Sequence, residues 1–150
     1  MASNIPGRSI LRITQVLLAL VVFGLTAYLF VAYQFDDIAI YMFAVSIWSA
    51  FFATPYLSLA PVRFDHAAKH IVIPAVETLT TLLWLAAFIA LATKLLPADQ
   101  CNFAGCHASQ VAVLFGAIEF ALFTVTTIQS FLALRSERPS TAPEKEIQEV

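Results

Sequence analysis

The stretch SQVAVLFGAIEFALFTVTTIQSFLAL, residues 109–134, decides the fold class of this chain. It holds a single ionisable side chain, Glu119, and exceeds the about 20 predominantly apolar residues that a helix needs to cross a bilayer. Three similar stretches precede it, at residues 10–33, 38–62 and 71–96. In lipid every backbone polar group must be paired within its own segment, so each stretch is expected to be a helix. The sequence therefore predicts an all-α, membrane-embedded four-helix bundle.

The composition leads to the same fold class. The 150 residues are 60% hydrophobic and 12% charged, whereas soluble domains are about 45–50% apolar and about 25% charged. A soluble protein of this size cannot cover so much apolar surface, so lipid must be its solvent. The net charge of −2 and the lack of a basic stripe give no reason to expect a nucleic-acid partner.

The chain is long enough for one domain. We expect a short N-terminal segment at residues 1–7, a four-helix transmembrane domain at residues 8–134 and a cytoplasmic tail at residues 135–150. The tail is polar, contains prolines and has no apolar period. It is therefore expected to be disordered.

The positive charges predict how the bundle sits in the membrane, because Lys and Arg favour the cytoplasmic side. Arg8 and Arg12 precede or begin the first apolar stretch, and Arg63 and Lys69 lie between the second and the third. Both termini are therefore expected in the cytoplasm. The loop at residues 97–108 is expected to be extracellular or lumenal, in the plasma membrane or an endomembrane.

The only two cysteines, Cys101 and Cys106, lie at this loop. An exterior loop is in an oxidising compartment, and Gly105 eases the turn that would bring the two thiols together, so a structural disulfide is favoured. Free or lipid-modified thiols are a second possibility. Redox or metal chemistry is a third, although CxxC is the usual redox spacing and only His107 is at hand as a further ligand.

Two carboxylic acids, Glu77 and Glu119, lie inside the apolar stretches, where ionisable residues are costly and are candidates for function. From the helix rise, Glu77 lies about 9 Å from the cytoplasmic end of its helix and Glu119 about 15 Å from the exterior end of its own. They are thus too far apart in depth to share a proton. We expect a neutral Glu119 to contact the indole N–H of Trp48 or Trp84. Protonated carboxyls that join helices are favoured over a proton or ion path and over contact with lipid headgroups or a partner.

Small residues recur every four positions at Ala108, Ala112 and Gly116. In membranes such spacing lets helices approach closely. Packing within one four-helix bundle is the favoured explanation, and a face for self-association is the alternative.

No common catalytic motif, such as HExxH, GxSxG or a P-loop, occurs in the chain. His66 and His70 are spaced as one helical face, but two ligands are too few for a metal site. No catalytic, cofactor-binding or metal-binding residue is expected, and the protein is predicted not to be an enzyme. The prolines at 55, 61 and 74 are expected near cytoplasmic helix ends rather than at a break near the midplane.

The stretch CHASQVAVLFGAIEFALFTVTTI, residues 106–128, and the aromatic and small residues of YMFAVSIWSAFF, residues 41–52, carry a family resemblance. With four spans, cytoplasmic termini, a short first exterior turn and two cysteines in the second exterior loop, residues 8–134 resemble the MARVEL domain, in particular that of short fungal membrane proteins. The resemblance implies a non-catalytic role in membrane subdomains, vesicle trafficking or membrane apposition. It also favours the disulfide.

The expected partners are therefore membrane lipids, with self-association or other membrane proteins as further possibilities. Two other functions stay open. One is a small proton- or ion-coupled transporter that uses Glu119 or Glu77 as its coupling carboxylate. The other is a membrane thiol oxidoreductase that uses Cys101 and Cys106.

Overall fold

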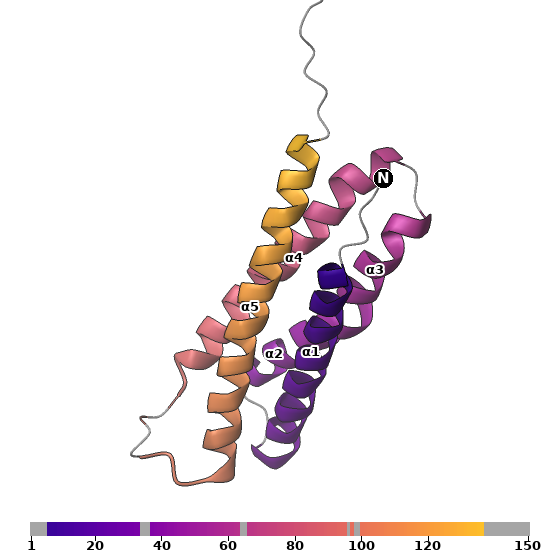
Figure 1. Cartoon of the computed structure of the whole chain (residues 1–150). Coiled ribbons are helices and arrows are strands. Elements are labelled where there is room, and N and C mark those ends of the chain that lie inside the picture. Colours follow the sequence, from indigo (N-terminus) through magenta and orange to yellow (C-terminus); the bar gives the residue numbers. More distant parts are fainter. Residues whose placement is uncertain (1–5, 34–36, 64–65, 96, 98–99, 137–150) are drawn as a thin grey trace, which may run out of the picture.

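A computed structural model describes the backbone of residues 6–33, 37–63, 66–95, 97 and 100–136, and the side chains of residues 9–32, 37–59, 71–95, 97 and 100–136. Its elements are α1 (Pro6–Tyr33), α2 (Asp37–Ile47), the π-helix η1 (Trp48–Ala53), α3 (Thr54–Arg63), α4 (His66–Ala92) and α5 (Ala104–Ser136) (Figure 1). The described residues include no β-strand. The predicted all-α class is confirmed.

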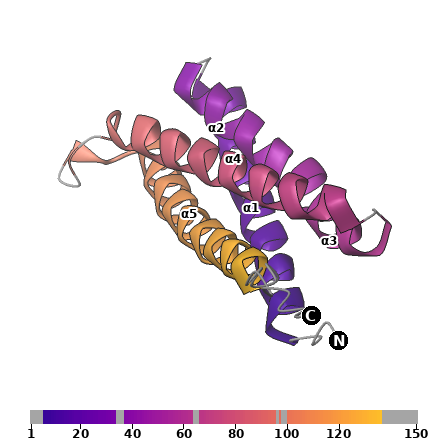
Figure 2. The same ribbon diagram turned by 90° about the horizontal axis from the view of Figure 1, so that it is seen from above.

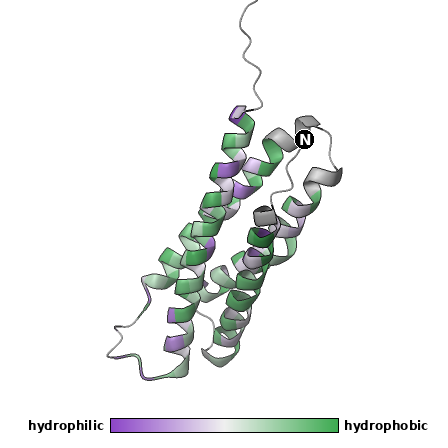
Figure 3. Cartoon of the chain, in the orientation of Figure 1, coloured by the Kyte–Doolittle hydropathy of each residue, from purple (hydrophilic) through white to green (hydrophobic). Residues whose placement is uncertain are grey.

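Four helical segments are long and apolar enough to cross a membrane: Ser9–Ala32, Asp37–Leu59, Ile71–Ala92 and Ala104–Ser136. The second of these is built from α2, η1 and part of α3, and each of the others belongs to one helix. Hydrophobic residues cover the helices along most of their length (Figure 3). The prediction of four membrane helices is confirmed.

The four spans surround a common core. α1 packs against α2 and α5, and α4 packs against the same two helices. α1 and α4 are therefore diagonal partners, with no close backbone approach among the described residues. The beginning of α1 and the end of α5 lie at one end of the bundle (Figure 1), and the view from above shows that the helices are inclined to one another (Figure 2). We call this the terminal end and the opposite one the cysteine end.

Buried residues recur on α1, α4 and α5 at alternating intervals of three and four, which is the spacing of helices that pack side by side in bundles. The remaining faces carry exposed leucine, isoleucine, valine and phenylalanine side chains that suit contact with lipid. The buried stripes are Gln15, Ala19, Val22, Thr26 and Leu29 on α1; Glu77, Thr80, Trp84, Ala87 and Leu91 on α4; and Ala112, Gly116, Glu119, Phe123, Thr126 and Ser130 on α5.

The π-helix η1 interrupts the second span near its middle. Pro55 follows it closely and lacks the N–H that an α-helix would bond to a carbonyl one turn earlier, so the turn widens. The Thr54 backbone N–H instead reaches the Ser49 carbonyl, five residues back, and the Thr54 hydroxyl donates to the same oxygen at 2.8 Å. The expectation that Pro55 only shapes a helix end is wrong.

Helix ends also differ from the expected ones in two places. α4 begins at His66, so Pro74 lies inside a helix, and the Thr78 hydroxyl donates to the Pro74 carbonyl at 2.7 Å. α5 begins at Ala104, five residues before the expected start of the fourth span, because polar and small residues can form the first turns of a helix outside the lipid. Residues 1–5 and 137–150 lie outside the described residues, so the disordered tail stays a prediction.

Candidate functional site

An ion pair crosses the core between the diagonal helices α1 and α4. The Arg12 guanidinium donates through Nη2 to Glu77 Oε1 and through Nη1 to Gln15 Oε1, the latter at 3.1 Å. Glu77 and Gln15 are fully buried, and the Arg12 side chain is 12% exposed. This pair was not predicted from the sequence, where Arg12 served only as a signal of topology. Arg12 and Gln15 precede Ala19 at the same three- and four-residue spacing as the buried residues of α1. That spacing could have predicted that Arg12 faces the core.

Glu119 lies further along the core, against the backbone of Ala19 on α1. Ala19 follows Arg12 by seven residues, so the two carboxyls meet α1 at levels about 10 Å apart. Apart from this backbone contact, neither Glu119 oxygen has a hydrogen-bond partner among the described residues. The two acids are thus separate features of one core.

The expected hydrogen bond between Glu119 and an indole is not formed. Trp48 Nε1 donates to Thr80 Oγ1 at 3.2 Å, because Trp48 opens the π-helix on the side that faces α4. Trp84 is fully buried, and its Nε1 has no acceptor in the described part of the chain. This expectation is wrong because the partners of Trp48 depend on the register of η1, which is not evident from the sequence.

Six buried side-chain atoms have no hydrogen-bond partner in the described part of the chain: Gln15 Nε2, Ser49 Oγ, Glu77 Oε2, Trp84 Nε1 and both Glu119 carboxyl oxygens. An unpaired buried polar atom costs about 1–3 kcal/mol. These atoms come from α1, η1, α4 and α5, which together enclose the core. We call Arg12, Gln15, Ser49, Glu77, Trp84 and Glu119 the polar column.

The small residues of α5 pack inside the bundle. Ala112 and Gly116 are buried, and Ala108 is half-buried. A Cβ atom on Gly116 would lie 2.5 Å from Met42 Cε of the diagonal helix α2 and 3.1 Å from Phe88 Cβ of α4. Packing within one bundle therefore explains Ala112 and Gly116. A self-association face does not fit these two residues, because their own bundle covers them.

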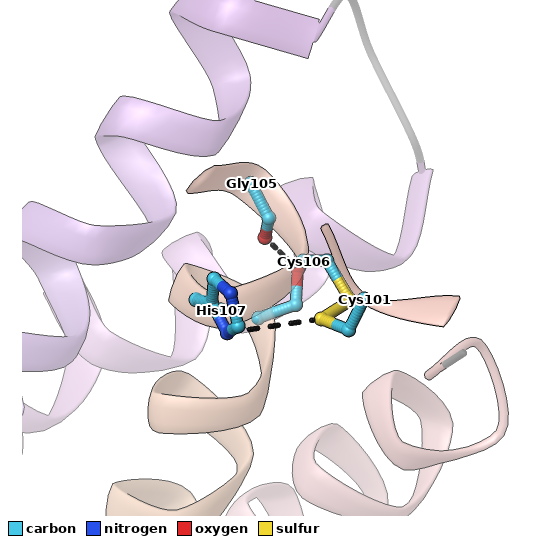
Figure 4. The surroundings of a disulfide bond; sticks show 5 residues. Cys101, Gly105, Cys106 and His107 are labelled. Carbon is cyan, nitrogen blue, oxygen red and sulfur yellow. Dashed lines mark hydrogen bonds between the residues drawn. A yellow bond between two sulfur atoms is a disulfide. The ribbon is translucent and has the colours of Figure 1, made fainter. Parts of the chain in front are cut away.

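Cys101 and Cys106 are joined by a disulfide, with Cα atoms 5.6 Å apart, at the start of α5 (Figure 4). The Cys106 N–H donates to the Phe103 carbonyl at 3.1 Å, and His107 Nδ1 lies 3.9 Å from Cys101 Sγ. Both cysteines are buried. Reactive thiols are usually accessible, so this arrangement suits a structural link between residues 100–103 and α5.

An apolar groove of about 440 Å³ lies on the outer side of η1. The rings of Trp48 and Phe52, which both line this groove, are stacked with their centroids 6.0 Å apart. The Trp48 N–H already donates to Thr80, so it is not free to bind a polar ligand. The lining residues are Trp48, Phe51, Phe52, Ala53, Pro55, Tyr56 and Val76.

Four apolar spans around a common core, with an apolar outer surface, define a multi-pass integral membrane protein. The MARVEL family model, which describes a membrane-associating domain, matches residues 5–129. The chain therefore belongs to the MARVEL family, and the resemblance seen in the sequence is confirmed. Comparison with curated proteins and with solved structures gives no match.

Proposed function

We propose that this protein organises membrane subdomains, or supports trafficking and membrane apposition, through helix–helix and lipid contacts and without catalysis. Its membership in a family of membrane-associating domains supports this role. The observation that carries the proposal is the apolar groove at η1, which lies on an outer surface rich in exposed hydrophobic side chains. The charged side chains Arg12 and Glu77, in contrast, are paired with each other in the core.

The proposed occupant of the groove is a hydrocarbon chain of a bilayer lipid. The groove residues from α2, η1 and α3 belong to the candidate span Asp37–Leu59, where lipid is the solvent. Phe51 and Phe52 are more than half exposed at the groove, so a chain can enter from the side. The aromatic side chains that line the groove at the widened π-helical turn can surround a lipid chain. They therefore offer it more van der Waals contact than the convex face of a regular helix.

Filling the groove is expected to disperse the protein in the membrane. A fluorescent fusion at the C-terminal end would be imaged in living cells, and its lateral mobility would be measured. We expect slowly exchanging patches for the wild type and a uniform, faster-diffusing signal for Val76→Phe, because the added ring occupies the space of the lipid chain. Leu79→Phe, at a lipid-exposed position of α4 outside the groove, is the control and should keep the patches. Patches unchanged in Val76→Phe would contradict the proposal.

We also propose that the disulfide forms in the cell, in a loop at residues 97–108 that faces the exterior of the plasma membrane or the lumen of an endomembrane. Replacing both Cys101 and Cys106 with alanine should lower the free energy of unfolding by about 2 kcal/mol, the value expected for so short a loop. Thermal unfolding of the purified protein in detergent measures this. Reductant should lower the melting temperature of the wild type and leave the double variant unchanged. Alkylation of both thiols in protein isolated without reductant would contradict the disulfide.

A proton- or ion-coupled transporter that uses Glu119 or Glu77 is the second candidate. One observation favours it: η1 widens the second span near its middle, beside the polar column, and transporters often use irregular helices near the middle of the membrane. Such a transporter would show a pH-dependent flux in proteoliposomes that Glu119→Gln abolishes. A thiol oxidoreductase has less support, because Cys101 and Cys106 are both buried.

A further inference from the structure

We propose that the polar column holds a file of bound water molecules that runs from Arg12 at the terminal end to Glu119 near the middle of the core. The unpartnered atoms include N–H donors, carboxyl oxygens and a hydroxyl that can do both. Buried water typically makes about three hydrogen bonds to protein groups that would otherwise be unpaired. Water both donates and accepts hydrogen bonds, so successive water molecules can pair with all of these atoms.

The Arg12 guanidinium fixes the first water site. It binds Gln15 through the amide oxygen, so the Gln15 Nε2 donor must point elsewhere. It binds Glu77 through Oε1, which leaves Oε2 as a free acceptor. A water molecule can accept from Gln15 Nε2 and donate to Glu77 Oε2. The Arg12 side chain, which is 12% exposed near the beginning of α1, is the proposed entry for water from the terminal end.

Ser49 provides the middle of the file. The hydrogen bond from Trp48 to Thr80 places the start of η1 beside the part of α4 between Glu77 and Trp84. Ser49, which follows Trp48 in the sequence, is fully buried. Its hydroxyl has no partner in the described part of the chain. Other buried hydroxyls donate to carbonyls earlier in their own span, namely those of Thr26, Ser46, Thr54, Thr80 and Thr126. The Ser49 hydroxyl is thus available to a ligand in the core.

The file ends at Trp84 and Glu119. Trp84 Cζ3 lies 3.7 Å from the position of a Gly116 Cβ, and Glu119 is about one turn along α5 from Gly116, so both side chains border the same region. Toward the cysteine end the buried residues of α4 and α5 include the apolar Leu91 and Ala112, and the buried Thr26 hydroxyl of α1 already donates to the Val22 carbonyl of its own helix. Water therefore reaches Glu119 from the terminal end, and the core beyond it is dry.

Water-edited solid-state NMR of the full chain in lipid bilayers tests the file. Magnetisation is transferred from water to each side chain, and the build-up rates are compared. The signals of the Glu77 and Glu119 carboxyl carbons should build up about as fast as the side-chain signal of the exposed Asn102. They should build up several-fold faster than the signals of Val22 and Phe123, which are fully buried and apolar. Build-up at Glu119 as slow as at Val22 would overturn the proposal without any variant.

A substitution that removes the Ser49 hydroxyl, in the middle of the file, distinguishes a continuous file of water from separate water sites. Ser49→Val should slow the build-up at Glu119 to the rate of Val22 and leave that at Glu77 unchanged. Ser46→Val is the matched control, because Ser46 is buried on α2 and its hydroxyl donates to the Phe43 carbonyl at 2.7 Å. Fast build-up at Glu119 in Ser49→Val would overturn the file. An unfolded variant would reveal itself by fast build-up at Val22, and the wild-type result would then decide alone.

Discussion

Arg12→Met is expected to lower the free energy of unfolding by about 3–5 kcal/mol, because it leaves Glu77 buried in the core without its cation. Methionine keeps most of the length and apolar volume of the arginine stem, so the loss reports the ion pair rather than a cavity. Glu77→Leu should cost less, since Arg12 is partly exposed and can extend its long side chain toward water. Chemical unfolding of the purified protein in detergent measures both losses.

The double variant Arg12→Met/Glu77→Leu should be about as stable as the wild type, because a well-packed apolar pair can replace a buried ion pair at little cost. The coupling energy from this double-mutant cycle measures the contact itself. Lys94→Met is the control for the loss of a positive charge, because Lys94 is exposed near the end of the third span and should change stability by about 0.5 kcal/mol or less. A double variant as unstable as Arg12→Met alone would contradict the assignment of the pair.

Gly116→Leu should also lower the free energy of unfolding, by about 1–3 kcal/mol or more, because the core around Gly116 is already filled. Met42 can move its flexible end away from a new Cβ, but Phe88 approaches through its own Cβ and cannot do so without shifting α4. The melting temperature of the purified protein measures the effect. Loss of patches in this variant would therefore report a damaged bundle rather than a lost contact between proteins.

Gly24→Leu is the matched control for Gly116→Leu. A Cβ on Gly24 meets nothing within 4 Å, since the residue faces outward from α1. Leucine is a better helix former than glycine, so this variant should be neutral or gain up to about 1 kcal/mol. Equal effects of the two substitutions would show that α5 does not pack as described.

The four spans could be predicted because long apolar runs in lipid leave the backbone no alternative to helix. The distance in depth between Glu77 and Glu119 also follows from the helix rise alone. The Arg12–Glu77 pair could not be predicted in the same way. It depends on which helices face each other across the core, and charge counts contain no information on that order.

The π-helix could not be predicted either, although Pro55 is its visible cause. A proline close to the end of an apolar run is equally compatible with a helix end, and only the structure shows that the second span continues past it as α3. The spacing of Cys101 and Cys106 favoured their pairing. The early start of α5 was missed because Gly105, Cys106 and His107 do not continue the apolar pattern.

The central claim, that this protein organises lipid through its outer surface, is tested most directly with purified protein in giant vesicles. The full chain, fluorescently labelled, would be reconstituted into bilayers of mixed saturated and unsaturated phospholipids close to demixing, together with a lipid tracer. The account predicts that wild type and Leu79→Phe form clusters enriched in the tracer and that Val76→Phe does not. Uniform protein and tracer in the wild-type vesicles, at every protein density, would contradict it.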